Sequence, residues 1–447
     1  MKIVIIGAGP CGLGAAQRLT ELDHGHWTLF EREEAAGGLA ASRRDPQGFT
    51  WDFGGHVVFS HFPEFDRMLE ETCGGELVPL QRRSYVKVGD SWVPYPFQNN
   101  LHRLPEDQAL DAVAGLKSRP GGHPSLPFDR WLEATFGAGI TRLFMRPYNE
   151  KVWATDLALM ASSWVGERVS IISYEDAQKR LALKTDDFDW GPNSAFRYPL
   201  RGGTGEIFRR QAALLPQDRL HYRADVAWVD LAAKTVGFEN GTAARYDRLI
   251  TTMPLIELVR RCFNLPEDIR RSAERLRHSG VYVSGCGFQA AVSGEWTWTY
   301  FPEPKIPFYR ATNFGRYSRF NVPDGRTDRY CAYVCETSFS DTKPEFQDII
   351  TQATWTSLYD IGWVSPSAPK ASEFAVRLPY AYPVPTLDRD EALRSIQSYL
   401  MAHDVYSRGR FGAWLYELGN MDHAFKQGRD VVDFILQGRK ESVWSMT

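Results

Sequence analysis

The sequence predicts an α/β protein in which a parallel sheet is interrupted by one helical insertion and one insertion of antiparallel strands. Three observations support this fold class. The first 31 residues contain, in order, a β-branched strand, a glycine-rich turn, an apolar-periodic helix and a second strand. Helical periodicity dominates from about residue 104 to 183. Several strand-like runs between residues 281 and 378 have no helix between them, which is typical of an antiparallel sheet.

The composition is that of a globular protein and excludes several classes. The 447 residues are 43% hydrophobic, 13% aromatic and 24% charged, and this length favours about three domains. A net charge of −3 argues against a protein that coats nucleic acid or an anionic membrane. The sequence contains no run of about 18 apolar residues, so no membrane-spanning helix is expected. The cysteines have neither CxxC nor zinc spacing, so we expect no metal site and reduced thiols in a cytoplasmic protein.

The N-terminal turn predicts a dinucleotide site. Its glycines are Gly7, Gly9 and Gly12, and the second strand ends at Glu31. Gly7 permits the tight turn, Gly9 lets the backbone approach a pyrophosphate, and Gly12 lets helix and strand pack closely. The helix N-terminus favours phosphates, and Glu31 can accept hydrogen bonds from ribose hydroxyls. These residues alone do not separate FAD from NAD.

The remaining elements are expected in the following order. Hairpins are predicted over residues 81–93 and around Asn240-Gly241, strands over 281–290, 297–301, 330–336 and 373–378, and a last helix over 421–436. Gly137 and Gly139 argue against one unbroken helix over residues 128–144. The N-terminal unit is too small to be complete by residue 80. We therefore expect a discontinuous FAD-binding domain (1–80, part of 195–275, and 380–447), a helical substrate or lid domain (100–190) and an antiparallel sheet domain (81–99 plus 276–379).

Several segments together resemble the UDP-galactopyranose mutase family, in particular its eukaryotic-type branch. They are residues 51–59, 92–100, 144–153, 166–169, 201–205, 307–312 and 408–412. Their order and separation match the family from residue 3 to about 437. In addition, residues 36–40 resemble the extended fingerprint of FAD proteins of the glutathione-reductase and amine-oxidase type.

The resemblance implies a flavin-dependent mutase that interconverts the pyranose and furanose forms of a nucleotide-diphosphate sugar, with no net redox change. In the family the substrate is UDP-galactopyranose, and N5 of reduced FAD attacks the anomeric carbon. NADPH or NADH is the implied reductant, and the protein supplies orientation and electrostatics. The implied partner is a nucleotide sugar, with no nucleic acid or membrane partner, and a homo-oligomer is left open.

The resemblance also assigns roles to residues. His56 lies beside the flavin N5 edge, and Arg168 and Arg310 hold the departing diphosphate, where fixed positive charge matches the growing negative charge. Residues implied to bind the cofactor are Gly7, Gly9, Cys11, Gly12, Glu31, Gly38, Leu39, Gly54, Gly55, Val226, Arg410, Gly419, Asn420 and Met421. Residues implied to bind substrate, besides the two arginines, are Phe59, Tyr95, Phe97, Gln98, Asn149, Trp153, Asn193, Tyr300, Tyr317, Tyr382 and Tyr416. Arg82 and Ser84 match positions near NADPH.

Some of these assignments have a plainer alternative. Each of the four tyrosines from Tyr300 to Tyr416, taken alone, is better explained by core packing, and only the set favours substrate binding. For Phe97 and Trp153, core packing is the alternative to substrate binding. Arg310, by contrast, stands in an apolar run, an odd place for a solvated charge. The chain departs from the family where Leu415 replaces a usual Arg, where Cys11 replaces a common Thr, and where residues 321–330 lack a longer insertion.

Three rival functions stay open. The first is a mutase acting on a different nucleotide sugar, such as a GDP-hexose, because arginines recognise the pyrophosphate that every nucleotide sugar has. The second is an FAD-dependent amine oxidase-like oxidoreductase, which shares the N-terminal fingerprint. The third is a flavin- or nucleotide-binding protein without catalysis.

Overall fold

The computed structural model describes residues 1–191 and 193–445 of the chain. All six cysteines lie in this part, and all are buried and unpaired. No helix in these ranges combines the length and the apolar character needed to cross a bilayer.

A five-stranded parallel sheet forms the N-terminal core. Its order is β19 (Val405–Ser407), β13 (Arg248–Thr251), β1 (Ile3–Ile6), β2 (Trp27–Phe30) and β9 (Leu220–His221). Every residue of β1 is buried, as expected for a central parallel strand of β-branched residues. The predicted order of strand, turn, helix and strand is therefore confirmed, and so is the α/β fold class.

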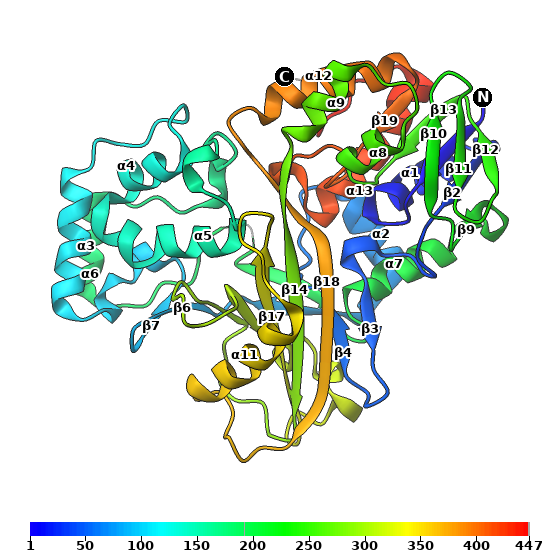
Figure 1. Cartoon of the computed structure of the whole chain (residues 1–447). Helices are drawn as coiled ribbons and strands as arrows, with labels where there is room; N and C mark the ends of the chain where they lie inside the picture. The colour runs from blue at the N-terminus through cyan, green and yellow to red at the C-terminus, as the bar shows by residue number, and fades with distance from the viewer. Residues whose placement is uncertain (192, 446–447) are drawn as a thin grey trace.

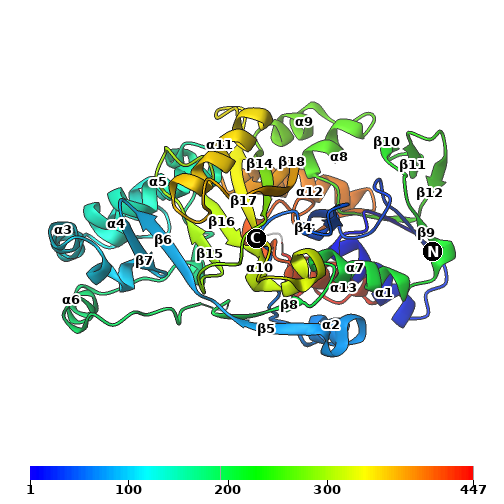
Figure 2. The same cartoon turned by 90° about the horizontal axis from the view of Figure 1, so that it is seen from below.

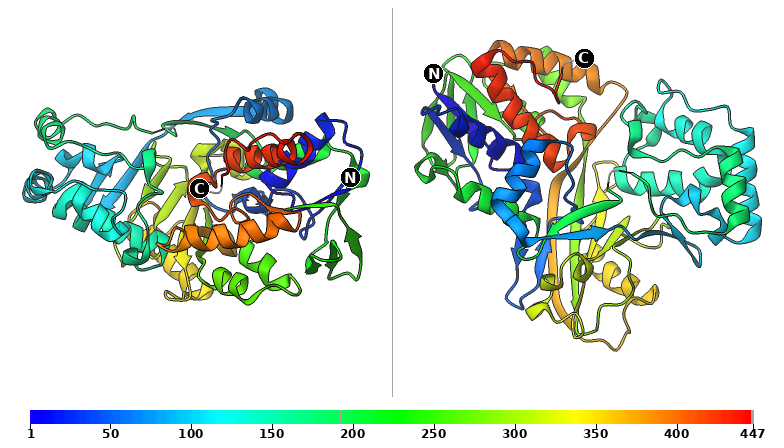
Figure 3. Two further views of the ribbon diagram at one scale, coloured as in Figure 1. Left: turned by 90° about the horizontal axis from the view of Figure 1, so that it is seen from above. Right: turned by 180° about the vertical axis from the view of Figure 1, so that it is seen from behind.

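Two helices pack together on this sheet. They are α1 (Pro10–Glu21), which joins β1 to β2, and α13 (Met421–Gln437), coloured blue and red in Figure 3. The helices approach at backbone level, because a Cβ on Gly14 would lie 2.4 Å from the Phe425 carbonyl oxygen and a Cβ on Gly428 would lie 1.9 Å from the Cys11 carbonyl oxygen. Segments from both ends of the chain thus complete one layer.

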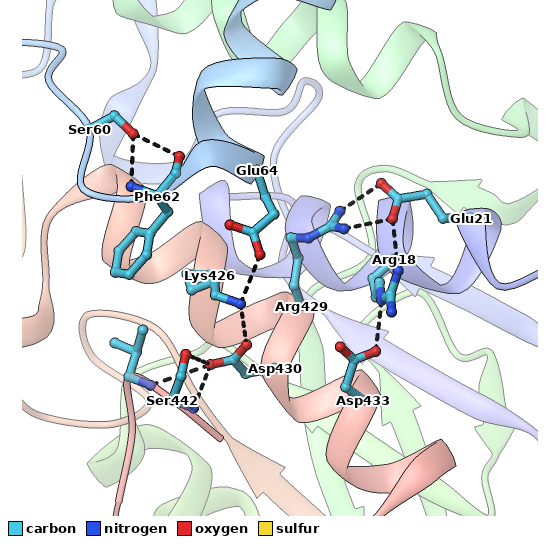
Figure 4. Close-up of polar contacts among 11 residues, drawn as sticks. Arg18, Glu21, Ser60, Phe62, Glu64, Lys426, Arg429, Asp430, Asp433 and Ser442 are labelled. Carbon is cyan, nitrogen blue, oxygen red and sulfur yellow. Dashed lines mark hydrogen bonds and ion pairs between the residues drawn. The ribbon is translucent and has the colours of Figure 1, made fainter. Parts of the chain in front are cut away.

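Ion pairs fix α13 in place (Figure 4). Arg429 donates two hydrogen bonds, of 2.7 and 2.6 Å, to the Glu21 carboxylate of α1. Lys426 lies 3.1 Å from Glu64 of α2 (Pro63–Cys73) and 2.8 Å from Asp430. Arg429 is buried, whereas the Glu21 side chain is 34% exposed, so this pair is open to water on one side.

A seven-stranded sheet forms the second layer. Its order is β18 (Lys370–Val384), β14 (Arg277–Phe288), β17 (Cys331–Phe339), β16 (Arg310–Asn313), β15 (Trp298–Tyr300), β6 (Ser84–Val88) and β7 (Ser91–Pro94). The predicted antiparallel pairing holds at every neighbour except one, because β6 runs parallel to β15. No hairpin joins these two strands, so no turn dictates their relative direction.

The helical region lies at the opposite end from the N-terminal sheet (Figures 1 and 2). It contains α3 (Glu106–Ser118), α4 (Phe128–Ile140), α5 (Arg146–Trp153) and α6 (Tyr174–Leu183). The expected break in the helical pattern of residues 128–144 occurs at Gly137, which has φ +71°. A Cβ there would lie 2.3 Å from the Gly115 backbone, so only glycine lets α3 and α4 approach this closely.

Smaller elements connect these layers. The predicted turn at Asn240-Gly241 is confirmed between β11 (Thr235–Phe238) and β12 (Ala243–Arg245), with Gly241 at φ +81°. The other strands are β3 (Ser42–Arg44), β4 (Thr50–Asp52), β5 (Leu77–Gln81), β8 (Ala195–Pro199) and β10 (Val226–Asp230). Helices that the sequence did not predict are α2, α7 (Thr204–Ala213), α8 (Leu255–Arg261), α9 (Glu267–Glu274), α10 (Phe314–Tyr317), α11 (Gln347–Asp360) and α12 (Arg389–Ala402). The expectation that no helix separates the strands of residues 281–378 is therefore wrong, because α10 and α11 lie between them, although the sheet is antiparallel as predicted in this region.

Candidate functional site

The turn after β1 forms a cradle for a pyrophosphate. A Cβ on Gly7 would lie 2.1 Å from Thr252 Oγ1, and a Cβ on Gly12 would lie 1.8 Å from the Gly7 carbonyl oxygen, so neither position admits a side chain. A Cβ on Gly9, in contrast, would have no neighbour nearer than Gly38 Cα at 3.8 Å. Gly9 is the N-cap of α1 and offers no side-chain cap, so the first N–H groups of the helix are available to an anion. This arrangement fits a dinucleotide cofactor.

Glu31 closes the same cradle at the end of β2. Its carboxylate accepts hydrogen bonds of 2.6 Å from the Ala8 N–H and 2.9 Å from the Glu33 N–H. Burial raises the pKa of Glu31. Two other residues that the sequence assigns to the cofactor, Leu39 and Val226, belong to one apolar cluster beside this strand, Val226 being fully buried.

A second uncapped helix N-terminus lies at the start of α13. Asn420 is its N-cap and makes no side-chain capping bond, which leaves the N–H groups that follow from Met421 available. The Gly409 N–H donates to Gln427 of α13 at 2.9 Å. A Cβ on Gly409 would lie 3.0 Å from the Cys11 Cβ. The turn after β1, the loop after β19 and α13 therefore meet, as a single cofactor site requires.

His61, Asp422 and His423 form a compact group at the start of α13. Their possible ligand atoms lie within 4.8 Å of one another. His61 Nδ1 is 2.7 Å and His423 Nδ1 is 3.1 Å from the Asp422 carboxylate, and the His61 N–H donates to the same group at 3.0 Å. These hydrogen bonds satisfy the buried carboxylate without an ion.

The Gly54-Gly55-His56 loop packs on the seven-stranded sheet. A Cβ on Gly55 would lie 2.3 Å from Thr312 Oγ1, so this position needs glycine. Gly54 has φ +139°, a conformation that side chains disfavour. The Gly55 N–H donates to Glu336 at 2.9 Å. The loop is thereby fixed to the sheet through one carboxylate.

His56 is held neutral at the centre of the site. Burial, against the opposing charge of Glu336 and together with the charges of Arg310 and Arg410, lowers the pKa of His56 to about 4. Its Nδ1 lies 3.5 Å from Thr204 Oγ1. A neutral imidazole can donate at one nitrogen and accept at the other.

Glu336 also holds Arg310. The two residues are register partners on β17 and β16, and Arg310 donates from Nε and Nη2 to the two carboxylate oxygens at 2.8 Å each. The Tyr309 hydroxyl donates to the same carboxylate at 2.6 Å and lies 3.0 Å from the Tyr382 hydroxyl. Burial would raise the pKa of Glu336, but the Arg310 charge and these hydrogen bonds outweigh it and lower the pKa. The sequence did not single out Glu336 or Tyr309, although an acid inside an apolar strand is a usable signal.

Seven aromatic residues near Arg310 form a row, which is called the aromatic wall below. Tyr300 is the register partner of Arg310 on β15. Ring contacts of 4.9 to 6.5 Å link its members in a row from the β6–β7 hairpin to the turn before α13. The row consists of Tyr95, Tyr300, Tyr148, Tyr309, Tyr382, Tyr416 and Trp153. Five of these seven are predicted substrate residues.

The other predicted arginines border this wall. Arg410 lies over the rings of Tyr382 and Tyr416, at 5.1 and 5.7 Å, and donates to the Ala381 and Gly419 carbonyls. Arg168 donates to the Glu417 carbonyl. Arg168 therefore lies beside the Tyr416 turn, whereas Arg310 lies on the sheet below the wall.

Some buried polar atoms around Gln98 and Tyr300 have no hydrogen-bond partner among the described residues. Gln98 donates from Nε2 to the Ser170 carbonyl, but its Oε1 has no partner. The Tyr317 hydroxyl, the Ser84 hydroxyl and the Trp298 indole N–H are likewise buried and unpaired.

Two predicted residues, Phe97 and Asn149, contact members of the aromatic wall or residues next to it. The Phe97 ring is fully buried against Phe144, and the Asn149 amide bonds to the Met145 carbonyl and receives the Trp153 indole N–H. Other predicted residues tie neighbouring segments together. Arg82 donates to Asn193 Oδ1 at 2.7 Å and to the Phe188 carbonyl at 2.9 Å, and the half-buried Phe59 ring lies 5.4 Å from His61.

Comparison with known proteins agrees with this geometry. Residues 5–72 match the model of an NAD(P)-binding Rossmann-like domain. The crystal structure of a reduced UDP-galactopyranose mutase matches the chain with a TM-score of 0.94 and 40% sequence identity, over 99% of this chain and 95% of that chain. The chain belongs to the UDP-galactopyranose mutase family. The resemblance inferred from the sequence motifs is confirmed.

More distant structures share the fold. Cyclohexylamine oxidase from Brevibacterium oxydans IH-35A matches with a TM-score of 0.68 and 16% identity, over 97% of this chain and 98% of that chain. A CLA-producing fatty acid isomerase from P. acnes matches with a TM-score of 0.65 and 16% identity, over 97% and 98%. At this identity the likeness extends to the architecture alone.

Proposed function

We propose that this chain is a flavin-dependent mutase that interconverts the pyranose and furanose forms of a nucleotide-diphosphate sugar, with UDP-galactopyranose and UDP-galactofuranose as the pair. Family membership supports the reaction class. The observation that carries the proposal is the position of Arg310, whose side chain is 22% exposed, beside a row of tyrosines. Glu336 occupies two of the five guanidinium N–H groups, so three remain for a diphosphate.

The chain's own residues have distinct roles in this proposal. Arg310 and Arg168 hold the diphosphate as negative charge develops on it. Tyr300 and Tyr382 stay protonated because burial raises the pKa of both phenols, so each can donate a hydrogen bond to phosphate oxygens. The wall excludes water from these contacts and so strengthens them.

FAD is the proposed cofactor. The cradle of Gly7, Gly9 and Gly12 suits its pyrophosphate, and the uncapped start of α13 suits the negatively charged reduced ring. Reduced FAD supplies the nucleophile for the anomeric carbon when it is bound. Neutral His56 provides a hydrogen-bonding edge next to this site. NADPH or NADH is the proposed reductant, near Arg82 and Ser84.

The proposed base site is formed by Tyr95 and Gln98. The Tyr95 ring offers a stacking face, and the unpaired Gln98 Oε1 can accept an N–H from a base. Uracil N3–H is such a donor, and guanine N1–H is another, so a GDP-hexose is the second candidate substrate. We further propose a cytoplasmic location, which buried, unpaired cysteines support, and the three-domain division predicted from the sequence.

Product analysis tests the proposal. Dithionite-reduced holoenzyme is incubated with UDP-galactofuranose or with GDP-hexoses, and the sugar nucleotides are separated by chromatography. We expect UDP-galactofuranose to convert to UDP-galactopyranose with reduced enzyme and not with oxidised enzyme. Conversion of a GDP-sugar but of no UDP-sugar would show the substrate to be wrong. Peroxide production from an amine without any isomerisation would show the reaction class to be wrong.

A further inference from the structure

Lys151 of α5 occupies a cage of backbone carbonyl oxygens. Its Nζ donates to the carbonyls of Phe301 at 2.7 Å, Glu303 at 3.0 Å, Ile306 at 2.7 Å and Phe308 at 2.8 Å. The side chain is 9% exposed, so water does not compete for these bonds. Four bonds from one buried ammonium make it the main partner of this loop.

The cage suits the charged form of the lysine. An ammonium has three protons to share among the four oxygens, whereas a neutral amine has two protons and a lone pair that would face an oxygen. Burial lowers the pKa of Lys151 to about 7, with Lys343 acting in the same direction, and Glu303 opposes it. The carbonyl dipoles also favour the charge.

The caged loop connects the two residues at the centre of the site. Residues 301–309 join β15 to β16, so Tyr300 stands directly before the loop and Arg310 directly after it. The Phe301 N–H donates to the Tyr309 carbonyl at 2.9 Å, which closes the loop at its base. Lys151 reaches this loop from α5, the helix that also carries Trp153 of the aromatic wall.

We propose that Lys151 is a positioning residue that fixes Tyr300 and Arg310 relative to α5 for binding of the substrate diphosphate. This inference rests on the proposed function, because the diphosphate is what these two side chains would hold. Loss of the ammonium removes a donor from all four carbonyls. The Glu303 carbonyl keeps the Ile306 N–H at 3.3 Å, but the buried carbonyls of Phe301, Ile306 and Phe308 lose a bond that water can replace only if the loop opens. A shift of about 1 Å at Arg310 is enough to weaken binding strongly.

The test compares Lys151→Met with a control on the same loop. Lys305 is 77% exposed in its side chain and forms only a surface ion pair with Glu303, so Lys305→Met removes a lysine without touching the cage. We expect UDP affinity, measured by calorimetry on the holoenzyme, to fall at least tenfold in K151M and less than twofold in K305M. Hydrogen exchange of residues 301–309 should rise only in K151M, while the flavin absorbance per protein stays unchanged in both. Wild-type affinity and wild-type exchange in K151M would overturn the proposal.

Two further measurements test the charge of Lys151 and its enclosure by the loop. In Lys151→Ala, n-propylammonium should restore UDP affinity, because it returns a cation to the cage, whereas neutral n-propanol should not. Equal effects of the two additives, or none from either, would refute the role of the charge. If neither variant folds, reductive methylation of the wild type tests whether Lys151 is enclosed. Lys151 should resist modification under conditions that modify Lys305. Equal rates of modification at the two lysines would refute the cage.

The proposed function and this inference fail differently. Wild-type holoenzyme that neither binds UDP nor isomerises a UDP-sugar contradicts the proposed substrate. The exchange of residues 301–309 in K151M against wild type still reports whether Lys151 fixes the loop. An unchanged exchange together with normal wild-type UDP binding contradicts the positioning role alone.

Discussion

Replacement of Glu336 by Gln should destabilise the protein more than any surface ion pair could explain. The carboxylate is 3% exposed and accepts four hydrogen bonds, two from Arg310, one from Tyr309 and one from the Gly55 N–H. Glutamine keeps the shape but removes the charge and one acceptor oxygen. Arg310, whose side chain is 22% exposed, is then a largely desolvated cation without a counter-charge.

The magnitude follows from burial. Removal of one partner from a buried ion pair costs about 3–5 kcal/mol, because the remaining charge stays desolvated. The glutamine carbonyl still accepts part of the hydrogen bonds, so we expect the lower end, about 3 kcal/mol. Glu391→Gln is the matched control, since Glu391 is 71% exposed in its side chain and pairs with Arg275 at 3.1 Å. Exposed pairs contribute at most about 1 kcal/mol.

Urea unfolding of the holoenzymes, followed by tryptophan fluorescence, measures both changes. We expect the midpoint of Glu336→Gln to shift far below that of wild type, and Glu391→Gln to stay close to wild type with the same slope. Equal midpoints for the two variants would refute the reasoning, because the buried pair would then be worth no more than an exposed one. A normal UDP affinity in Glu336→Gln would show that Arg310 keeps its place without the carboxylate.

Three further outcomes are expected. Arg310→Lys should weaken UDP binding about tenfold or more by calorimetry, since lysine lacks the planar fork, and an unchanged affinity would contradict the diphosphate role. Gly9→Ala should lower flavin content without loss of fold, whereas the unobstructed control Gly25→Ala should keep it. A folded-state pKa of His56 near 4, below the usual 6.5, means that wild type should lose stability relative to His56→Gln as pH falls between these values. Parallel stability curves for these two proteins would contradict the burial of His56.

The parts of the site that are formed by residues close together in the sequence could be predicted. The need for Gly12 could be predicted, because a Cβ there meets the Gly7 carbonyl oxygen of the same strand–turn–helix unit, whereas the atom that a Cβ on Gly7 meets belongs to Thr252, after β13. The tyrosines and Arg310 could be named from motifs, but not their mutual arrangement. The partners of Glu336 could not be predicted, because they come from two segments, at Gly55 and at Tyr309–Arg310, the first of which lies 281 residues away in the chain.

What the sequence by itself determined is the α/β order of elements, the dinucleotide cradle and the family, since short-range sterics and contiguous motifs carry this information. What only the tertiary structure decided is the parallel pairing of β6 with β15, the shared carboxylate of Glu336 and the carbonyl cage of Lys151. Each of these depends on contacts between segments that are distant in the chain. Their energies arise from burial, and burial exists only once the layers have packed.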